Sequence, residues 1–363
     1  MNYHIIPNEK FTEKFLRMMS SEHFCDTNTV FVYDMPGVEP FTRALFPNVT
    51  YISHTAFSNI AFADLEEGNN KLFVHALSDQ VLPFLYQNRK RSWMNRLVII
   101  LWGADIYNHY FILTSGDRRL HLGDREIERK KKKLLEHCRF YMTFAAPDYD
   151  FACKLYNCRG KQFDCLYPSN VDAEYLDAIL GKARNAGSGK TRVLLGNSAT
   201  KTNQHIEALN KLSKYKGYIQ IICPLSYGDF YYRDAVITHG NALFGTDFIA
   251  VTDYFLPEEY ATLLYSVDIA VFNNNRQQAT ANIEILAYLG KKIFIRSDTS
   301  MWGHYVVRDG CAFSDAIAIG QESFDAFRQI ADESVRKNHD YIKKVWNIDY
   351  VASLWDAVLN EPV

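Results

Sequence analysis

The sequence has no apolar run long enough to cross a bilayer. A membrane-spanning helix needs about 20 consecutive apolar residues, and the strongest apolar stretch here, residues 97–102, is far shorter. The opening residues 1–4 do not resemble a signal peptide. We therefore expect the chain to stay in the cytoplasm and not to span a membrane.

The sequence also lacks an excess of charge and a cysteine framework. Lys and Arg number 40 and Asp and Glu 42, a formal net charge of -2 over 363 residues, which argues against a protein that binds nucleic acid along its length. Seven cysteines, an odd number, fit reduced core thiols. Cys153, Cys158 and Cys165 lie close together without the C-x-x-C spacing of a zinc site, and we expect neither a metal nor a cofactor.

Apolar and aromatic residues are abundant: 48% of the chain is hydrophobic, with 24 Phe and 23 Tyr. Short apolar runs alternate with longer amphipathic stretches, which is typical of βαβ units and parallel sheets. We expect strands at 30–33, 49–53, 71–75, 97–102, 140–145, 192–195, 219–223, 248–251, 269–272 and 292–295. We expect helices at 10–19, 79–88, 172–184, 203–214, 231–244, 257–266 and 281–289.

The pattern changes near Tyr167, where a turn and a flexible Gly-Ser stretch at 186–189 interrupt it. We expect an N-terminal domain at 1–168, a linker at 169–190, a C-terminal domain at 191–324 and a helical tail at 325–363, with Trp346 and Trp355 on the apolar side of that tail. Doubly wound α/β domains bind ligands at the carboxyl ends of their strands. Two such domains facing across a cleft would place the functional residues in the loops after the strands.

Two such loops in the second half carry candidate ligand-binding residues. The first has Gly196, Asn197 and Ser198 between a strand and a helix, where a close backbone approach and free amides would suit a diphosphate. An ordinary turn with a Ser or Thr helix cap is the alternative. The second runs from Asn273 to Glu284 and offers a guanidinium and side-chain amides for phosphate and sugar hydroxyls at Arg276, Gln277 and Gln278. A solvated loop whose arginine pairs with an acid is its alternative.

Further candidates follow other strands. Trp102 and Gly103 precede Asp105, a carboxylate that could orient or deprotonate an acceptor hydroxyl, or that could simply cap the next segment. His75 ends another strand, where a structural role is the alternative to a functional one. Pro224 and Tyr227 follow a third strand and either border a nucleotide or form a turn.

A basic amphipathic segment extends from Arg118 to Lys133. Its densest part consists of Arg129, Lys130, Lys131, Lys132 and Lys133. Such a run in a near-neutral protein favours docking on an anionic membrane surface, and a solvated helix face is the alternative. We do not expect nucleic acid as the partner, because no recognition motif accompanies the charge.

These motifs occur in the same order in one family. The chain resembles the bacterial dTDP-N-acetylfucosamine:lipid II N-acetylfucosaminyltransferases, also called 4-alpha-L-fucosyltransferases, over most of its length. The resemblance rests on residues 102–107, 196–198, 203–206, 224, 227 and 276–278. It implies an α/β GT-B glycosyltransferase, with two Rossmann-like domains, that retains anomeric configuration and needs no metal ion.

The resemblance also implies the partners and where they bind. The C-terminal domain would hold a dTDP-sugar donor through Gly196, Asn197, Ser198, Arg276, Gln277 and Gln278. The N-terminal domain would face a polyprenyl-diphosphate-linked glycan acceptor, with Asp105 and His75 on that side. The protein would act at the cytoplasmic face of the inner membrane as a peripheral enzyme of enterobacterial common antigen synthesis. The helical tail would cross back toward the N-terminal domain.

Two departures from the family pattern leave the sugar open. Residues 279–281 read Ala-Thr-Ala where a glycine-bearing turn is expected, and Glu284 stands where many GT-B enzymes hold a ribose with a carboxylate. Another dTDP-4-amino-4,6-dideoxyhexose, in an O-antigen pathway, is therefore an alternative donor. A sugar-nucleotide epimerase of the two-domain α/β type and a non-catalytic polysaccharide-assembly protein are the alternative functions.

Overall fold

The computed structural model describes residues 1–9, 11–34, 46, 49–53, 65, 68–114, 122–169, 171, 173–181 and 189–363. Lys10, Arg118, Arg119, Asp172 and 182–188, which the sequence predictions include, lie outside these ranges. Contacts divide the chain into two compact units. Unit 1 comprises Met1–Asn170 and Trp346–Val363, and unit 2 comprises Val171–Val345.

Unit 1 is built on a seven-stranded parallel sheet in the order β3-β2-β1-β4-β5-β6-β7. Its strands are β1 (Asn2–Pro7), β2 (Asn28–Tyr33), β3 (Thr50–Ile52), β4 (Leu72–His75), β5 (Leu97–Leu101), β6 (Phe140–Thr143) and β7 (Lys161–Asp164). Each strand expected from an apolar run is present. The sequence prediction missed β1, an inner strand that pairs with both β2 and β4, and the partly exposed edge strand β7.

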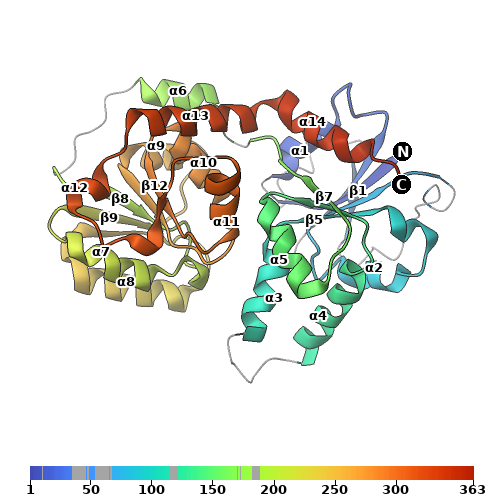
Figure 1. The fold of residues 1–363 in the computed structure, drawn as a ribbon, viewed down its shortest axis with the longest axis horizontal. Helices are drawn as coiled ribbons and strands as arrows, with labels where there is room; N and C mark the ends of the chain where they lie inside the picture. Colours follow the sequence, from blue (N-terminus) through green and yellow to red (C-terminus); the bar gives the residue numbers. More distant parts are fainter. Residues whose placement is uncertain are drawn as a thin grey trace. The chain divides into compact units, whose positions relative to one another are not determined.

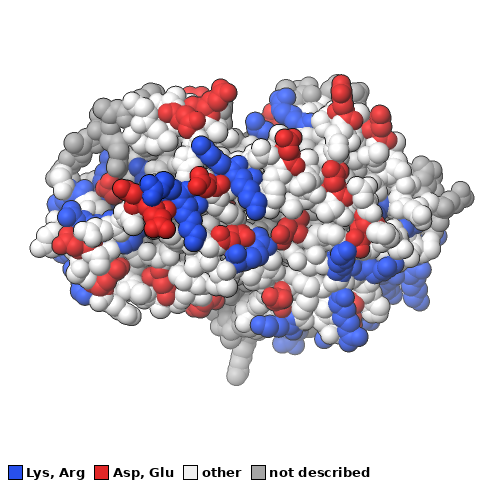
Figure 2. Space-filling model, turned by 45° about the horizontal axis from the view of Figure 1, so that its top comes forward, with Lys and Arg blue, Asp and Glu red and all other residues white. Residues whose placement is uncertain are grey.

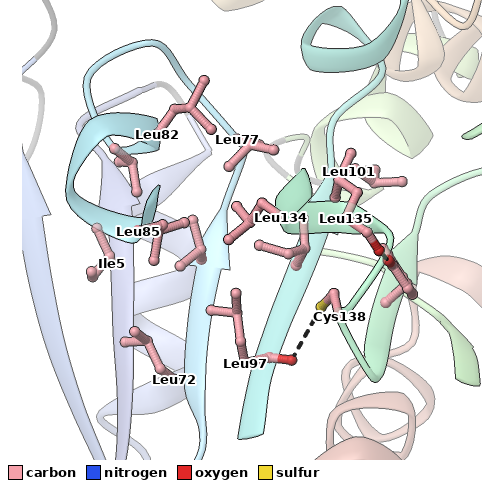
Figure 3. Close-up of a cluster of buried hydrophobic side chains, with 14 of the residues drawn as sticks. Ile5, Leu72, Leu77, Leu82, Leu85, Leu97, Leu101, Leu134, Leu135 and Cys138 are labelled. Atoms are coloured by element: carbon pink, nitrogen blue, oxygen red, sulfur yellow. Dashed lines mark hydrogen bonds between the residues drawn. The ribbon is translucent and has the colours of Figure 1, made fainter. Parts of the chain in front are cut away.

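Helices cover both faces of this sheet (Figure 1). They are α1 (Thr12–Met19), α2 (Leu82–Asn88), α3 (Ala104–Thr114), α4 (Leu122–Leu135), α5 (Ala146–Tyr156) and α14 (Ile348–Leu359), with a short 3-10 helix, η3 (Ser92–Arg96). On one face, leucines of α2 and α4 share a buried core with Leu97 and Leu101 of β5 (Figure 3). On the other face, α1 and α14 pack on alternate residues of the same strands, such as Val98 and Ile100.

The C-terminal helix α14 belongs to unit 1. Val351, Trp355 and Val358 are spaced so that they lie on one helical face, and all three are fully buried in the sheet's second core. The Trp355 indole N–H also donates to the carbonyl of Leu166 over 2.9 Å. Trp346, expected on the same apolar side, is only half-buried.

Unit 2 is built on a six-stranded parallel sheet in the order β10-β9-β8-β11-β12-β13. Its strands are β8 (Thr191–Leu195), β9 (Ile219–Pro224), β10 (Phe248–Val251), β11 (Ile269–Phe272), β12 (Lys292–Ile295) and β13 (Ser314–Asp315). Its helices are α6 (Ala173–Leu180), α7 (His205–Leu212), α8 (Phe230–Phe244), α9 (Pro257–Ser266), α10 (Thr280–Tyr288), α11 (Ser300–Trp302), α12 (Phe324–Arg328) and α13 (Asp332–Trp346). Within the stretch expected to be a linker, α6 packs against α9.

The strand order places two loops side by side. β8 and β11 are hydrogen-bonded neighbours in the middle of the unit 2 sheet, and both run in the same direction. The loops that leave their carboxyl ends, residues 196–204 and 273–279, therefore meet at one edge of the sheet. Below they are named the first loop and the second loop.

Candidate active site

The first loop begins at a position that requires glycine. Gly196 has φ +70°, and a Cβ there would lie 2.5 Å from Nε2 of His205 and 2.9 Å from Oδ1 of Asn203. Asn203 holds the loop in place: its side-chain amide donates to the carbonyl of Ser198 (3.1 Å), and its Oδ1 accepts from the amide of Asn197 (3.2 Å). Asn203, near the end of the first loop, therefore fixes the backbone conformation of the residues directly after β8.

The two loops are joined by Gln278. Its Nε2 donates to Oδ1 of Asn197 over 3.0 Å and approaches the Ser198 hydroxyl at 3.3 Å. Its Oε1 accepts from the Thr202 hydroxyl at 2.7 Å. The amide of Asn275 also donates to the carbonyl of Thr202 (3.0 Å). The structure thus brings together Asn197, Ser198 and Gln278, which the sequence assigns to one site from positions about eighty residues apart.

The loop after β9 also contacts the cluster formed by Asn197, Ser198 and Gln278. The Asn197 side-chain amide donates to the hydroxyl of Tyr227 (3.1 Å), and the amide of Ala199 donates to the Tyr227 carbonyl (2.8 Å). Burial raises the pKa of Tyr227, and its hydrogen bonds with Asn197 and Ser198, followed by the charge of Arg276, oppose that shift. Half of the Tyr227 side chain is exposed, so the cluster is open to solvent. Pro224 is the buried last residue of β9 and lies beneath the loop.

Neighbouring side chains of the second loop have different partners and different burial. Arg276 is half-buried and donates through Nη1 to the carbonyl of Gln277 (2.9 Å). Gln277 is buried and donates to the Thr280 hydroxyl at the start of α10 (3.2 Å), so its side chain supports the loop, a role other than the predicted contact with phosphate or sugar. Glu284, on the second turn of α10, is half-buried and accepts from the Tyr305 hydroxyl (3.4 Å).

The backbone amides available to an anion differ from the sequence prediction. In the first loop the amides of Gly196, Asn197 and Ala199 already donate to the Val271 carbonyl, to Oδ1 of Asn203 and to the Tyr227 carbonyl. Of the three residues predicted to contact the diphosphate, Gly196 and Asn197 therefore use their amides within the unit, and the contact through Ser198 stays a prediction. The amides in the first turn of α10 have no intrahelical carbonyl to donate to, as in any helix, and α10 begins directly after Ala279, which has φ +63°.

Two charged residues that the sequence prediction missed border the cluster. Arg296, directly after β12, donates to Glu207 of α7 (3.0 Å) and contacts Oδ1 of Asn273 (3.3 Å), which ties α7 to the second loop. Lys201, in the first loop, is mostly exposed and lies 3.5 Å from Asp229. Both residues follow the end of a strand, and this position could have indicated them from the sequence. The partners of Arg296, however, lie far away in the sequence.

In unit 1, Asp105 is buried and holds two strand ends together. Its Oδ2 accepts from the amides of Leu77 (3.1 Å) and Trp102 (3.3 Å). Burial raises the pKa of Asp105 in spite of these hydrogen bonds. Gly103, with φ +85°, makes the turn between Trp102 and α3. These contacts are structural but do not cap α3, because both amides precede that helix. Participation of Asp105 in chemistry stays a prediction.

His75 is completely buried, which contradicts a direct catalytic role. Its two ring nitrogens are 3.1 Å from Nδ1 of His4 and 2.5 Å from the Tyr167 hydroxyl. Tyr167 in turn accepts from the Trp102 indole N–H (3.0 Å), and His4 Nε2 reaches Oδ1 of Asn28 (3.1 Å). The Trp102 indole N–H can only donate and Oδ1 of Asn28 can only accept. In this row of hydrogen bonds, Tyr167 therefore donates to His75, and His75 donates to His4. His75 therefore supports the strand ends and positions Trp102.

The basic segment lies on α4 and divides into exposed and buried parts. Arg129, Lys132 and Lys133 are exposed, and Lys130 pairs with Glu126 at 2.9 Å. Lys131 is buried, and its Nζ donates to the carbonyl of Asp105 (2.6 Å). The assignment of Lys131 as membrane-facing is therefore wrong, because its ammonium group is used inside the unit.

No metal cluster occurs among the described residues, and all seven cysteines there are free. Asp148 and Asp150 have the Asp-x-Asp spacing of some metal sites, but both lie on α5, where residues two apart do not face each other. Asp148 is also buried and accepts from the Tyr107 hydroxyl (2.7 Å). No helix in the described ranges has the length and apolar character needed to span a membrane.

Comparison with known proteins decides the class of enzyme. Residues 51–317 match the model of the 4-alpha-L-fucosyltransferases, glycosyl transferase group 56. The chain belongs to this family. It is a glycosyltransferase, which implies a sugar-nucleotide donor and a glycan acceptor.

Solved structures show that this family member has the GT-B fold. A trehalose-phosphate synthase (UDP-forming) from Burkholderia xenovorans is 10% identical, with 100% of this chain and 99% of that chain covered and a TM-score of 0.67. A glycosyltransferase from Rickettsia africae is 12% identical, with 99% of both chains covered and a TM-score of 0.64. A trehalose-6-phosphate protein from E. coli, bound with UDP-2-fluoro glucose, is 10% identical, with 100% of both chains covered and a TM-score of 0.62.

Proposed function

We propose that this fucosyltransferase family member moves a 4-acetamido-4,6-dideoxyhexose of the N-acetylfucosamine type from a dTDP-sugar to a polyprenyl-diphosphate-linked glycan. The transfer retains anomeric configuration, uses no metal ion, and takes place at the cytoplasmic face of the bacterial inner membrane. It serves the assembly of a surface polysaccharide, either enterobacterial common antigen or O-antigen. The family match and the geometry of the two loops in unit 2 support this proposal.

The single observation that carries the donor site is the junction of the two loops at Gln278. Its hydrogen bonds to Asn197 and Ser198 fix a polar surface at the carboxyl edge of β8 and β11. Ligands of doubly wound sheets bind at this edge. Arg276 and the exposed Tyr227 flank that surface, so a charged phosphate and a flat base can both be accommodated.

Breaking the bond between the sugar and the diphosphate leaves negative charge on the phosphate oxygens. In our proposal, Arg276 and the first-turn amides of α10 compensate that charge, a task for which other enzymes use a metal ion. Glu284, one turn further along α10, holds the ribose hydroxyls. Gln278 and Asn197 orient the sugar through the polar atoms that their mutual hydrogen bond leaves available.

Membrane attachment is the second part of the proposal. The exposed cations of α4, Arg129, Lys132 and Lys133, lie on unit 1, the unit assigned to the lipid-linked acceptor. Each basic residue near an anionic bilayer surface contributes about 1 kcal/mol. Trp102, held by Tyr167 at the end of β5, and Gly103 beside it, would face the acceptor.

A nucleotide panel tests the donor assignment. At about one hundred times its dissociation constant, a ligand stabilises the folded chain by about 2.7 kcal/mol. We expect dTDP to raise the melting temperature by several degrees, and UDP and GDP to do so less. Arg276→Ala should remove most of the rise, whereas Arg328→Ala, which removes an exposed arginine of α12, should leave it intact. No response to any nucleoside diphosphate would contradict the proposal.

A further inference from the structure

A pocket of about 540 Å³ opens at the amino edge of the unit 1 sheet, at the opposite ends of the strands from Trp102 and Asp105. Its floor is Leu97 at the start of β5, Leu134 of α4 and Cys138 before β6, which lie together in Figure 3. Its rim comes from the segment between α2 and β5 and from the end of α4. The remaining lining residues are Arg89, Arg91, Ser92, Met94, Asn95, Lys133, Glu136 and His137.

The charges around this pocket are unbalanced. Three permanent cations, Arg89, Arg91 and Lys133, line it together with one carboxylate, Glu136. That carboxylate already accepts from the Asn157 side-chain amide at 3.1 Å. Within the described part of the chain, no carboxylate lies within 4.0 Å of the Lys133 ammonium group. An anion in the pocket would therefore meet a Lys133 ammonium group that no carboxylate already holds.

Arg89 is held in place before any ligand arrives. Its guanidinium lies 4.2 Å from the centre of the Tyr86 ring, and its Nη1 donates to the Tyr86 carbonyl at 2.7 Å. A guanidinium has five N–H groups in a fixed fork, so one hydrogen bond leaves others for a ligand. Because less rotamer entropy is lost on binding, such a preorganised fork suits the planar, two-point recognition of a phosphate.

The surface around the pocket is basic as well. A second pocket of about 390 Å³ shares Glu136, His137 and Cys138 with the first and adds Arg139 and Arg159. On α4, the exposed cations Arg129 and Lys132 lie outside the lining of both pockets. Figure 2 shows Lys and Arg side chains close together at the lower right of the view, on the side where Figure 1 places α2.

The pocket is too far from the reacting end of the sheet to form part of the acceptor site there. β5 runs from Leu97, in the pocket, to Leu101, next to Trp102. Five residues of strand span about 17 Å at about 3.3 Å per residue. A ligand in the pocket therefore does not compete with groups at the carboxyl edge.

We propose that this basic pocket, lined by Arg89, Arg91 and Lys133, binds the phosphate headgroup of an anionic membrane lipid. The preorganised Arg89 guanidinium and the Lys133 ammonium group select a phosphate, and the flanking cations of α4 favour a phosphate that is part of a charged surface over a free one. The apolar floor accepts the carbon atoms next to the phosphate. This inference rests on the membrane part of the proposed function and not on the donor.

Two double variants with the same loss of charge test the pocket. Arg91→Ala with Lys133→Ala removes two lining cations, and Lys90→Ala with Lys132→Ala removes their neighbours, which are exposed but do not line the pocket. The readout is sedimentation with vesicles of phosphatidylcholine and phosphatidylglycerol. Loss of surface charge alone weakens vesicle binding of both pairs by a similar factor, up to about thirtyfold for two cations. We expect the lining pair to lose at least about tenfold more binding than the control pair.

Equal losses for the two pairs, or no loss for either, would overturn the pocket and leave an ordinary basic surface. If the lining pair does not fold, the single variants Lys133→Ala and Lys132→Ala provide the same comparison. If inorganic phosphate raises the melting temperature of the wild-type chain while vesicle binding is insensitive to the lining pair, the ligand is a soluble phosphate and the lipid assignment fails. The nucleotide panel on the wild-type chain tests the donor separately, so either proposal can fail alone.

Discussion

Gln278 and Asn197 lie about eighty residues apart in the sequence, and their side chains are joined by a hydrogen bond of 3.0 Å. The same Gln278 side chain accepts from Thr202, so it connects the second loop to the first at two points. A polar surface fixed in this way is ready for a ligand without reorganisation. The predictions below follow from this junction, from the two loops that it connects and from the buried histidines of unit 1.

Removing the junction should impair transfer. A hydrogen bond between neutral groups contributes about 1 kcal/mol, and Gln278→Ala removes its bonds to both Asn197 and Thr202. We expect kcat/KM for the dTDP-sugar to fall about five- to thirtyfold. The double variant with Asn197→Ala should lose less than the sum of the single losses, because the two side chains act on one another. Strict additivity would show that the two loops work independently.

Arg276→Ala should lower turnover at least about tenfold. A hydrogen bond to a charged group is worth about 1.5–3 kcal/mol, and the diphosphate becomes more negative as the sugar leaves. Arg276→Lys should restore only part of the rate, because an ammonium group lacks the planar fork. Steady-state transfer kinetics measure both, with Arg328→Ala as the control of equal charge. Normal turnover in a folded Arg276→Ala chain would remove this residue from the mechanism.

Gly196→Ala should destabilise unit 2 by more than the backbone conformation alone explains. At φ +70° a side chain costs about 1–2 kcal/mol, and here the new Cβ would also lie 2.5 Å from the His205 ring. Gly217→Ala is the matched control, since Gly217 has φ +89° and nothing within 4 Å of the added Cβ. Urea unfolding should show a loss for Gly196→Ala that exceeds the control by at least about 1 kcal/mol. Equal losses would mean that the first loop relaxes around the methyl group.

The stability of unit 1 should decrease as the pH falls below about 6.5. Burial lowers the pKa of His4 to about 4, and burial, followed by the charge of His4, lowers the pKa of His75 well below its usual value. The unfolded chain takes up these protons near pH 6.5, so the folded state binds fewer protons in this range. Stability is full above pH 6.5 and is lost toward pH 4, at up to about 1.4 kcal/mol per pH unit for each histidine.

Tryptophan fluorescence during urea unfolding measures this effect, because Trp355 stacks on His75 at a ring distance of 5.6 Å. The comparison variant is His4→Asn, which should unfold more easily at pH 7 and should show a smaller change between about pH 7 and pH 5. An unfolding midpoint for the wild-type chain that stays constant over that range would contradict the burial of neutral histidines.

Much of the fold follows from the sequence because buried parallel strands are continuous apolar runs. β1 was missed because His4 interrupts its apolar pattern, and only the contacts with Asn28 and His75, both distant in the sequence, make that position suitable for burial. β7 was missed because an edge strand can be polar, as Lys161–Asp164 is. β13 has only two residues and gives no periodic signal.

The candidate site was predictable in its location but not in its side-chain directions. Strand ends and small polar residues indicate both loops of unit 2, and Asn197, Ser198 and Gln278 do meet there. Neighbouring residues look alike in sequence, yet Gln277 turns inward to Thr280 while Gln278 reaches across to Asn197. Lys131 likewise looks like its neighbours, but the Asp105 carbonyl binds it inside the unit. Such choices depend on tertiary contacts that local patterns do not contain.

Hydrogen exchange of the wild-type chain with and without dTDP tests the central claim most directly. If the nucleotide binds at the carboxyl edge of the unit 2 sheet, peptides covering residues 196–204, 224–228 and 273–284 gain protection, and peptides from the unit 1 strands do not. Unchanged exchange in those three segments under saturating dTDP, or protection confined to other parts of the chain, would contradict the account.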